Sequence, residues 1–221
     1  MTTPHPLPTL TVWGELPRFA IGFARDIRVR WALEEAGRPY QIHRLGRDEC
    51  DTPAYRAKQP FGQMPVYQDA QVTLFESGAI LHYIAQDCPA LMPDDRAGRA
   101  HTLSWLFASV NSFEQDLMGV IALDHQPKDA AWVAERRPAL EEALHKRLAS
   151  VEAWLQERDY LVEERFTVAD ILLAWELKLV DAVGALAPYP RLSAYYRRCT
   201  ARPAYAKALA DHVAVCQQAA A

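Results

Sequence analysis

The pattern of apolar and polar positions changes once along the chain, near residue 90. Before that point, short runs with the two-residue period of a strand alternate with runs at helical spacing. Leu10–Trp13 predicts a strand, and Val29–Ala36 predicts a helix because its apolar residues recur three and four positions apart. A second strand is expected over Tyr40–Leu45 and a short helix over Pro53–Lys58.

The next two apolar runs predict an antiparallel hairpin. They cover Met64–Tyr67 and Val72–Phe75, with a turn between them. Ser77 is a good N-cap for the following helix, whose apolar face includes Ile80 and Ile84. The predicted order, β-α-β-(α)-β-β-α, describes a small mixed sheet flanked by helices.

After a linker over residues 89–95, the remaining segments have helical spacing. The expected helical stretches lie near residues 103–113, 140–155, 171–179, 190–201 and 203–217. The sequence therefore predicts an α/β domain over residues 8–88 and an all-α helical bundle over residues 97–217.

Composition and charge exclude several classes of protein. The 221 residues carry 28 acidic and 24 basic side chains, a formal net charge of −4, without the basic stripe of a nucleic-acid-binding protein. No apolar run is long enough to span a membrane, and the N-terminus lacks the pattern of a secretory signal. The four cysteines and seven histidines lack the spacing of disulfide or metal sites, so we expect no metal and a reducing cytoplasm.

The first candidate binding motif is Gln63-Met64-Pro65. Pro65 opens a predicted strand, where a proline costs a ladder hydrogen bond. A cis peptide bond before Pro65 would turn the N–H and C=O of Met64 out of the sheet, where they can pair with a peptide ligand. The alternative is a trans proline that only ends an edge strand.

The second candidate motif is Glu76-Ser77-Gly78, at the turn from strand to helix. The Ser77 hydroxyl and the N–H groups of the first helical turn suit a carboxylate, and Glu76 suits an ammonium group. The motif thus matches the zwitterionic end of an amino acid. The alternative is purely structural, with Ser77 as helix cap and Glu76 as a favourable charge.

Together these motifs resemble the glutathione transferase family. The resemblance also rests on Val29–Gly37 and on the change from α/β to all-helical sequence near residue 95. It implies a thioredoxin-like N-terminal domain, an all-α C-terminal domain, a homodimer, and glutathione as the co-substrate.

Carried over residue by residue, the resemblance assigns parts of glutathione to the motifs. The backbone of Met64 would pair with the cysteinyl residue, and Pro65 would be a cis-proline. Glu76 and Ser77 would hold the γ-glutamyl end. Gln63 would approach the glycyl carboxylate.

The resemblance extends to Phe166–Ile171 in the second half of the chain. There Thr167 can cap a helix while Asp170, three residues on, returns a hydrogen bond to the backbone. We interpret this box as structural, so that losing Asp170 harms folding more than chemistry.

The segment that should carry the thiol-activating residue departs from the family pattern. The family usually places a Tyr, Ser or Cys just after the first strand or at the start of the first helix, and residues 14–30 contain none. Arg25, near the predicted helix start, is our candidate catalytic residue, because a nearby positive charge favours the thiolate. Arg18 in the preceding loop could do the same.

The alternative for this arginine is structural. Arg25 can form an ion pair with a nearby acid such as Asp26 or Glu76. Arg28 and Arg30 lie on the same helix, and we expect them to be solvated or to lie between domains.

The pocket for a small hydrophobic electrophile is expected between the α/β domain and the first helices of the bundle. Each of its aromatic candidates would serve equally well in the core. The main candidates are Phe19, Phe23, Trp105 and Ser109, and further contributors are Phe107, Asn111 and Phe113.

Three functions are compatible with these features. The leading hypothesis is an enzyme that adds the glutathione thiolate to an electrophile. A non-catalytic glutathione- or ligand-binding module is favoured by the missing Tyr, Ser or Cys. A glutathione-dependent isomerase, dehalogenase or disulfide reductase is the third, although no cysteine lies near the predicted site.

Overall fold

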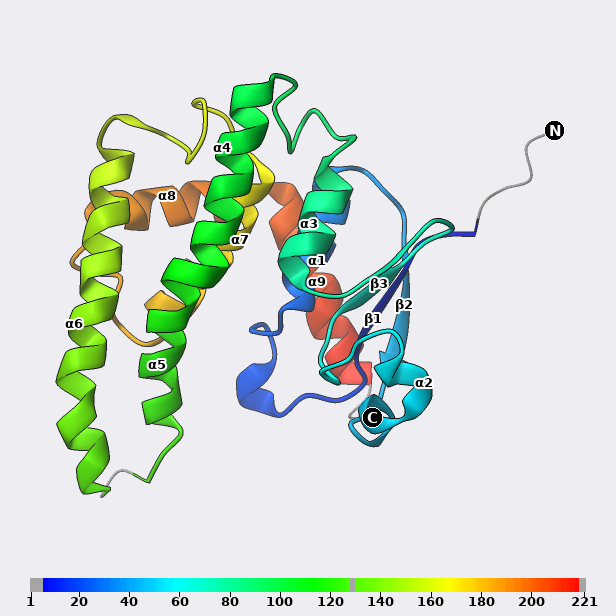
Figure 1. Cartoon of the computed structure of the whole chain (residues 1–221), viewed down its shortest axis with the longest axis horizontal. Coiled ribbons are helices and arrows are strands. Elements are labelled where there is room, and N and C mark those ends of the chain that lie inside the picture. Colours follow the sequence, from blue (N-terminus) through cyan, green and yellow to red (C-terminus); the bar gives the residue numbers. More distant parts are fainter. Residues whose placement is uncertain (1–5, 128–129, 219–221) are drawn as a thin grey trace. The chain divides into compact units, whose positions relative to one another are not determined.

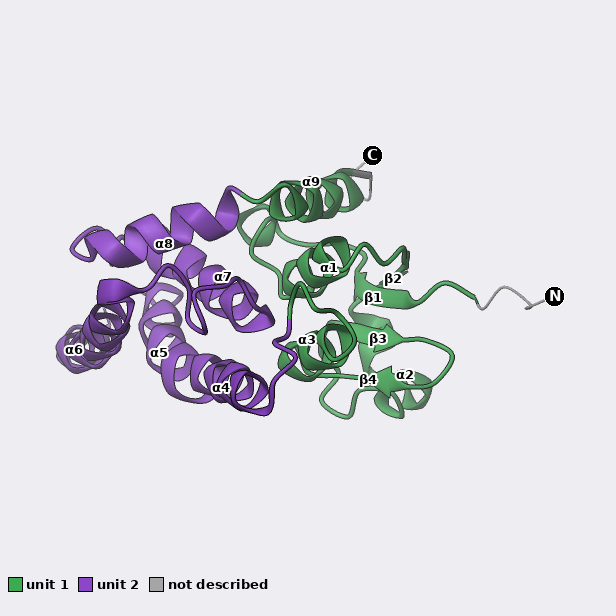
Figure 2. Cartoon of the chain, turned by 90° about the horizontal axis from the view of Figure 1, so that it is seen from above, with its two compact units in different colours: residues 1–91, 202–221 green, residues 92–201 purple. Residues whose placement is uncertain are grey.

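The computed structural model of the chain describes residues 6–127 and 130–218. It divides into two compact units, residues 1–91 with 202–221 and residues 92–201 (Figure 2). The last helix of the chain therefore belongs with the first unit, although it follows the bundle in sequence.

In the described part of the chain, the first unit is built around a four-stranded sheet in the order β2-β1-β3-β4 (Figure 1). Its strands are β1 (Thr9–Trp13), β2 (Gln41–Leu45), β3 (Val66–Gln68) and β4 (Thr73–Leu74). β1 pairs parallel with β2 and antiparallel with β3, which pairs antiparallel with β4. The predicted mixed sheet is confirmed. β3 is shorter than its apolar run because Pro65 has no N–H to donate to a ladder.

Helices cover both faces of this sheet. One face carries α1 and α3, and α9 packs along α1 (Figures 1 and 2). The other face carries a small cluster in which Leu45 and Val66 from the sheet pack with Cys50, Tyr55 and Met64. The elements are α1 (Asp26–Glu35), α2 (Pro53–Arg56), α3 (Ser77–Ala85), α9 (Pro203–Gln218) and the 3-10 helices η1 (Arg18–Ala20) and η2 (Asp48–Asp51).

The second unit is helical. Its central helix is apolar along most of its length and buried between α4, α5 and α8, as expected for a helix without a polar face. Every described helix is too short or too polar to cross a membrane. The elements are α4 (Arg96–Phe107), the π-helix η3 (Ala108–Phe113), α5 (Glu114–Asp124), α6 (Ala131–Trp154), the 3-10 helix η4 (Leu155–Glu157), the central α7 (Val168–Ala182) and α8 (Pro190–Thr200).

Candidate binding site

The first binding motif lies where the chain enters β3. The Met64–Pro65 peptide bond is cis, as predicted. Met64 is buried, and no group within residues 6–127 or 130–218 bonds to its backbone N–H or C=O. Because buried backbone groups almost always have a hydrogen-bond partner, these two are well suited to pair with the backbone of a ligand.

Tyr55 fixes this segment from the α2 side. Its hydroxyl donates to the carbonyl oxygen of Gln63 at 2.6 Å and lies 3.2 Å from the sulfur of Met64. Burial raises the pKa of Tyr55, so the hydroxyl stays protonated and remains a donor. The exposed side chain of Gln63 is thus carried on an anchored backbone.

The second motif is the start of α3. The N-cap is Glu76, at φ 66° and without a side-chain hydrogen bond to the helix, and the helix begins at Ser77. The prediction that Ser77 is the N-cap is therefore wrong. Its hydroxyl instead accepts a hydrogen bond from Nη1 of Arg28 on α1, at 3.0 Å.

This bond determines what the Ser77 hydroxyl can offer. An arginine only donates, so the hydroxyl oxygen accepts from Arg28 and its own proton is left to be donated elsewhere. The first N–H groups of a helix have no intrahelical acceptor, and the side chain of the N-cap residue, Glu76, does not bond to them. A positive guanidinium, a hydroxyl proton and the start of a helix thus converge on one place. Such a group is suited to an anion.

The prediction that Arg28 and Arg30 are solvated is wrong. Arg30 instead lies against α9, a helix that the sequence pattern assigned to the helical bundle. Arg28 and Arg30 are each only 1% exposed, because the helix that carries them is packed against both α3 and α9 within the first unit. Nε of Arg30 donates to Asp26 at 2.7 Å, and Nδ1 of His212 on α9 lies 3.1 Å from the same carboxylate oxygen. Burial by itself raises the pKa of Asp26, but His212 and Arg30 outweigh it and lower the pKa below its usual value.

Arg25, the candidate catalytic residue, is the N-cap residue of α1 and is half-buried. It therefore lies at the helix start, as expected. Asp26, one of its two suggested acidic partners, instead binds Arg30 and His212. Arg18 lies in η1 and is exposed. The role of Arg25 in activating a thiol stays a prediction.

The four main candidates for the electrophile pocket divide between the two units. In the first unit, Phe19 is 70% exposed and Phe23 is half-buried. In the second, the ring of Trp105 lies 5.3 Å from that of Trp154, and the buried Ser109 donates its hydroxyl proton to the carbonyl oxygen of Trp105. Ser109 therefore serves the helix backbone, and the common pocket stays a prediction.

Cys50 lies closer to the first motif than its position in the sequence suggests. It packs in the same apolar cluster as Met64 and Tyr55, and its thiol contacts the carbonyl oxygen of Gly46 at 3.4 Å. Burial raises the pKa of Cys50, which keeps it a thiol and a poor nucleophile. Among the described residues, no group of three or more His, Cys, Asp or Glu side chains could hold a metal ion.

Comparison with known proteins gives consistent results in both halves of the chain. Residues 14–86 match the model of the glutathione S-transferase N-terminal domain, and residues 118–203 match that of the C-terminal domain. The probable glutathione S-transferase GSTF2 of Oryza sativa subsp. japonica is 31% identical over 79% of this chain and 86% of its own length.

Two further similarities differ in kind. Elongation factor 1-gamma of Carassius auratus is 29% identical over 76% of this chain, which spans only 38% of the elongation factor. A solved glutathione transferase of Burkholderia graminis, with two glutathione molecules bound per subunit, superposes with a TM-score of 0.80. It covers 92% of this chain and 87% of its own at 22% identity, so this likeness concerns the fold.

Proposed function

Since the chain belongs to the glutathione S-transferase family, we propose that it binds glutathione in its first unit and transfers the thiolate to a small hydrophobic electrophile. The observation that carries this proposal is the start of α3. There a buried arginine turns the Ser77 hydroxyl into a donor beside an uncapped helix N-terminus.

Each part of glutathione has a counterpart in the site. The γ-glutamyl carboxylate accepts from the Ser77 hydroxyl and the first N–H groups of α3, and Glu76 receives the ammonium group. The cysteinyl backbone pairs with the free N–H and C=O of Met64, next to the cis-proline Pro65. Gln63, exposed on the same segment, reaches the glycyl carboxylate.

Arg25 is proposed to favour the thiolate of bound glutathione. Its guanidinium and the start of α1 both place positive charge at the same end of the helix, which would lower the pKa of a thiol held there. The thiolate then attacks the electrophilic carbon, so that an S–C bond forms and the leaving group departs with its electron pair. Phe19, Phe23, Trp105 and Ser109 remain the proposed surroundings of the electrophile.

A second candidate function is a glutathione-binding module without catalysis. Two observations favour it: residues 14–30 contain no Tyr, Ser or Cys, and elongation factor 1-gamma is among the relatives. We also propose that the protein is a homodimer in the cytoplasm, as the family resemblance implies. Light scattering of the purified protein tests whether it is a dimer.

The test separates binding from chemistry. Calorimetry should show glutathione binding in the millimolar range or tighter, and the dipeptide Cys-Gly, which lacks the γ-glutamyl end, binding at least about tenfold more weakly. Turnover of a chloro-nitro aromatic electrophile should fall about tenfold in Arg25→Ala and stay unchanged in the control Arg136→Ala, which removes an exposed arginine of α6.

Each outcome has a distinct meaning. No binding of glutathione at about 10 mM would contradict the whole proposal. Binding with no turnover in the parent protein would favour the non-catalytic module. Equal binding of glutathione and Cys-Gly would remove the assignment of Glu76 and Ser77. Full turnover in Arg25→Ala would show that Arg25 does not activate the thiol.

A further inference from the structure

The peptide group between Gln63 and Met64 is held by the protein on one side. Its carbonyl oxygen, on Gln63, accepts from the Tyr55 hydroxyl at 2.6 Å. Its N–H, on Met64, has no partner among residues 6–127 and 130–218. This peptide bond is trans, so the C=O and the N–H lie in one plane and point in opposite directions. The bond from Tyr55 therefore sets the direction of the Met64 N–H, which points away from the tyrosine.

The position of the Tyr55 hydroxyl is itself set by the fold. The ring packs with Cys50 and Val66, and the backbone N–H of Tyr55 donates to the hydroxyl of Thr52, the N-cap of α2, at 3.3 Å. The sulfur of Met64 lies 3.2 Å from the hydroxyl oxygen, but a thioether is a weak acceptor and the carbonyl oxygen is closer. The hydroxyl proton is thus directed to the carbonyl.

The loop that leads to this peptide group is also attached to α2. Nη1 of Arg56 donates to the carbonyl oxygen of Pro60 at 2.7 Å, and the N–H of Gly62 donates to the carbonyl oxygen of Gln59 at 3.1 Å. These bonds hold the chain up to the residue before Gln63. The orientation of the peptide group that follows depends on the tyrosine hydroxyl.

Given that the first unit binds glutathione as proposed above, we infer that Tyr55 is a positioning residue for this ligand. Its hydroxyl holds the Gln63–Met64 peptide group so that the N–H of Met64 faces the carbonyl oxygen of the cysteinyl residue. The hydroxyl thereby favours ligands that carry this carbonyl. A hydroxyl that only stabilised the fold would have no such preference.

Three ligands separate the cysteinyl carbonyl from the rest of glutathione. Glutathione and γ-glutamylcysteinamide both carry this carbonyl, and the second lacks the glycyl residue. γ-Glutamylcysteamine keeps the γ-glutamyl end and the thiol but has no cysteinyl carbonyl. Calorimetry on the whole protein compares the three ligands in the parent and in Tyr55→Phe, which keeps the ring and removes the hydroxyl.

The loss of affinity should follow the carbonyl. Tyr55→Phe should bind glutathione and γ-glutamylcysteinamide about threefold to tenfold more weakly than the parent does, as expected for one uncharged hydrogen bond. γ-Glutamylcysteamine should bind both proteins with equal affinity. In NMR spectra of the parent, glutathione should shift the amide proton signal of Met64, and this shift should be smaller in Tyr55→Phe.

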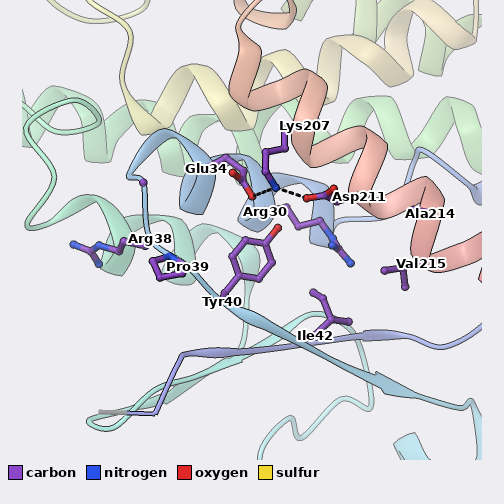
Figure 3. Close-up of a pocket in the computed structure, with 11 residues that line it drawn as sticks. Arg30, Glu34, Arg38, Pro39, Tyr40, Ile42, Lys207, Asp211, Ala214 and Val215 are labelled. Carbon is purple, nitrogen blue, oxygen red and sulfur yellow. Dashed lines mark hydrogen bonds and ion pairs between the residues drawn. The ribbon is translucent and has the colours of Figure 1, made fainter. Parts of the chain in front are cut away.

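Two further variants remove a tyrosine hydroxyl elsewhere in the first unit. Tyr67 on β3 is buried, and its hydroxyl donates to Asp69 at 3.1 Å. Tyr40 lies in a hollow of about 630 Å³ between α1 and α9, which no residue assigned to glutathione lines (Figure 3). Glutathione affinity should be unchanged in Tyr67→Phe and in Tyr40→Phe.

Four results would overturn the role of Tyr55 and leave glutathione binding in place. They are unchanged glutathione affinity in Tyr55→Phe, an equal loss of affinity for γ-glutamylcysteamine, an equal loss in Tyr67→Phe, and a Met64 amide signal that glutathione does not shift. A parent protein that binds no glutathione would instead contradict the proposed function, and the role of Tyr55 with it.

Discussion

Each unit contains a helix whose first turn is surrounded by buried polar side chains, and the two first turns are built in opposite ways. At α7 in the second unit, the donors are satisfied from within the protein. At α3 in the first unit, the N-cap side chain makes no bond to the helix, and we propose that a ligand accepts from the donors there. The difference separates a helix start that stabilises a fold from one that is suited to bind a ligand.

The start of α7 is closed by Asp170. One carboxylate oxygen accepts from the N–H of Leu161 at 3.0 Å and the hydroxyl of Tyr195 at 2.9 Å. The other accepts from the N–H of Thr167 at 2.7 Å and its hydroxyl at 2.9 Å. The predicted capping box is therefore confirmed, and Asp170 has no bonding capacity left for a ligand.

The start of α3 lacks an acidic side chain that could cap it in the way that Asp170 caps α7. The third residue of α7 is Asp170, and the third residue of α3 is Ala79, which has no acceptor. The Ser77 hydroxyl accepts a hydrogen bond from Arg28, and Glu76 makes no side-chain bond to the helix. We therefore infer that the third residue of the helix decides whether its start is capped by the protein itself or is suited to bind a ligand.

The largest expected effect is the loss of the closed helix start. Asp170→Ala leaves the N–H groups of Leu161 and Thr167 and the hydroxyl of Tyr195 buried without an acceptor. We expect the free energy of unfolding to fall by about 3–5 kcal/mol, measured by urea denaturation.

The matched control is Thr167→Ser, which keeps the capping hydroxyl and should cost under about 1 kcal/mol. Glutathione affinity of the folded Asp170→Ala protein should be unchanged, because the glutathione motifs lie in the other unit. A loss below about 1 kcal/mol in Asp170→Ala would show that the box is not structural.

The second effect concerns the open helix start. Ser77→Ala removes the hydroxyl proton that we assign to the γ-glutamyl carboxylate, and glutathione should bind about 10- to 50-fold more weakly by calorimetry. Ser77→Thr keeps the hydroxyl and serves as the control. Unchanged affinity in Ser77→Ala would mean that the bond from Arg28 is purely structural.

The sequence predicted well what depends on neighbouring residues. The order of strands and helices in the first 90 residues, the cis Met64–Pro65 bond and the capping box at Thr167 all follow from short motifs or local periodicity, whereas α5 (Glu114–Asp124) was not predicted. The motifs proposed to bind glutathione are also local, so Glu76 and Ser77 could be singled out from the sequence, and their role in binding stays a prediction.

What the sequence did not predict depends on contacts between distant segments. Arg28 and Ser77 lie 49 residues apart, and Asp26 and His212 lie 186 apart. Helical periodicity assigns polar residues to a solvated face, and nothing local shows that α9 returns to cover α1. The burial of Arg30 could not be predicted for the same reason.

The smallest effect converts the open helix start into the closed type. Ala79→Asp places a carboxylate at the position that Asp170 occupies in α7, and Ala79 is exposed, so the change should not disturb packing. A negative charge in the first turn should stabilise α3, raising the free energy of unfolding by about 0.3–1 kcal/mol.

The same carboxylate competes with the γ-glutamyl carboxylate for the N–H groups of that turn, so glutathione should bind about fivefold more weakly. Ala79→Asn, of similar size but uncharged, should lose less affinity. If Ala79→Asp binds glutathione as tightly as the parent protein, the first turn of α3 does not hold the carboxylate, and the openness of this helix start has no bearing on glutathione.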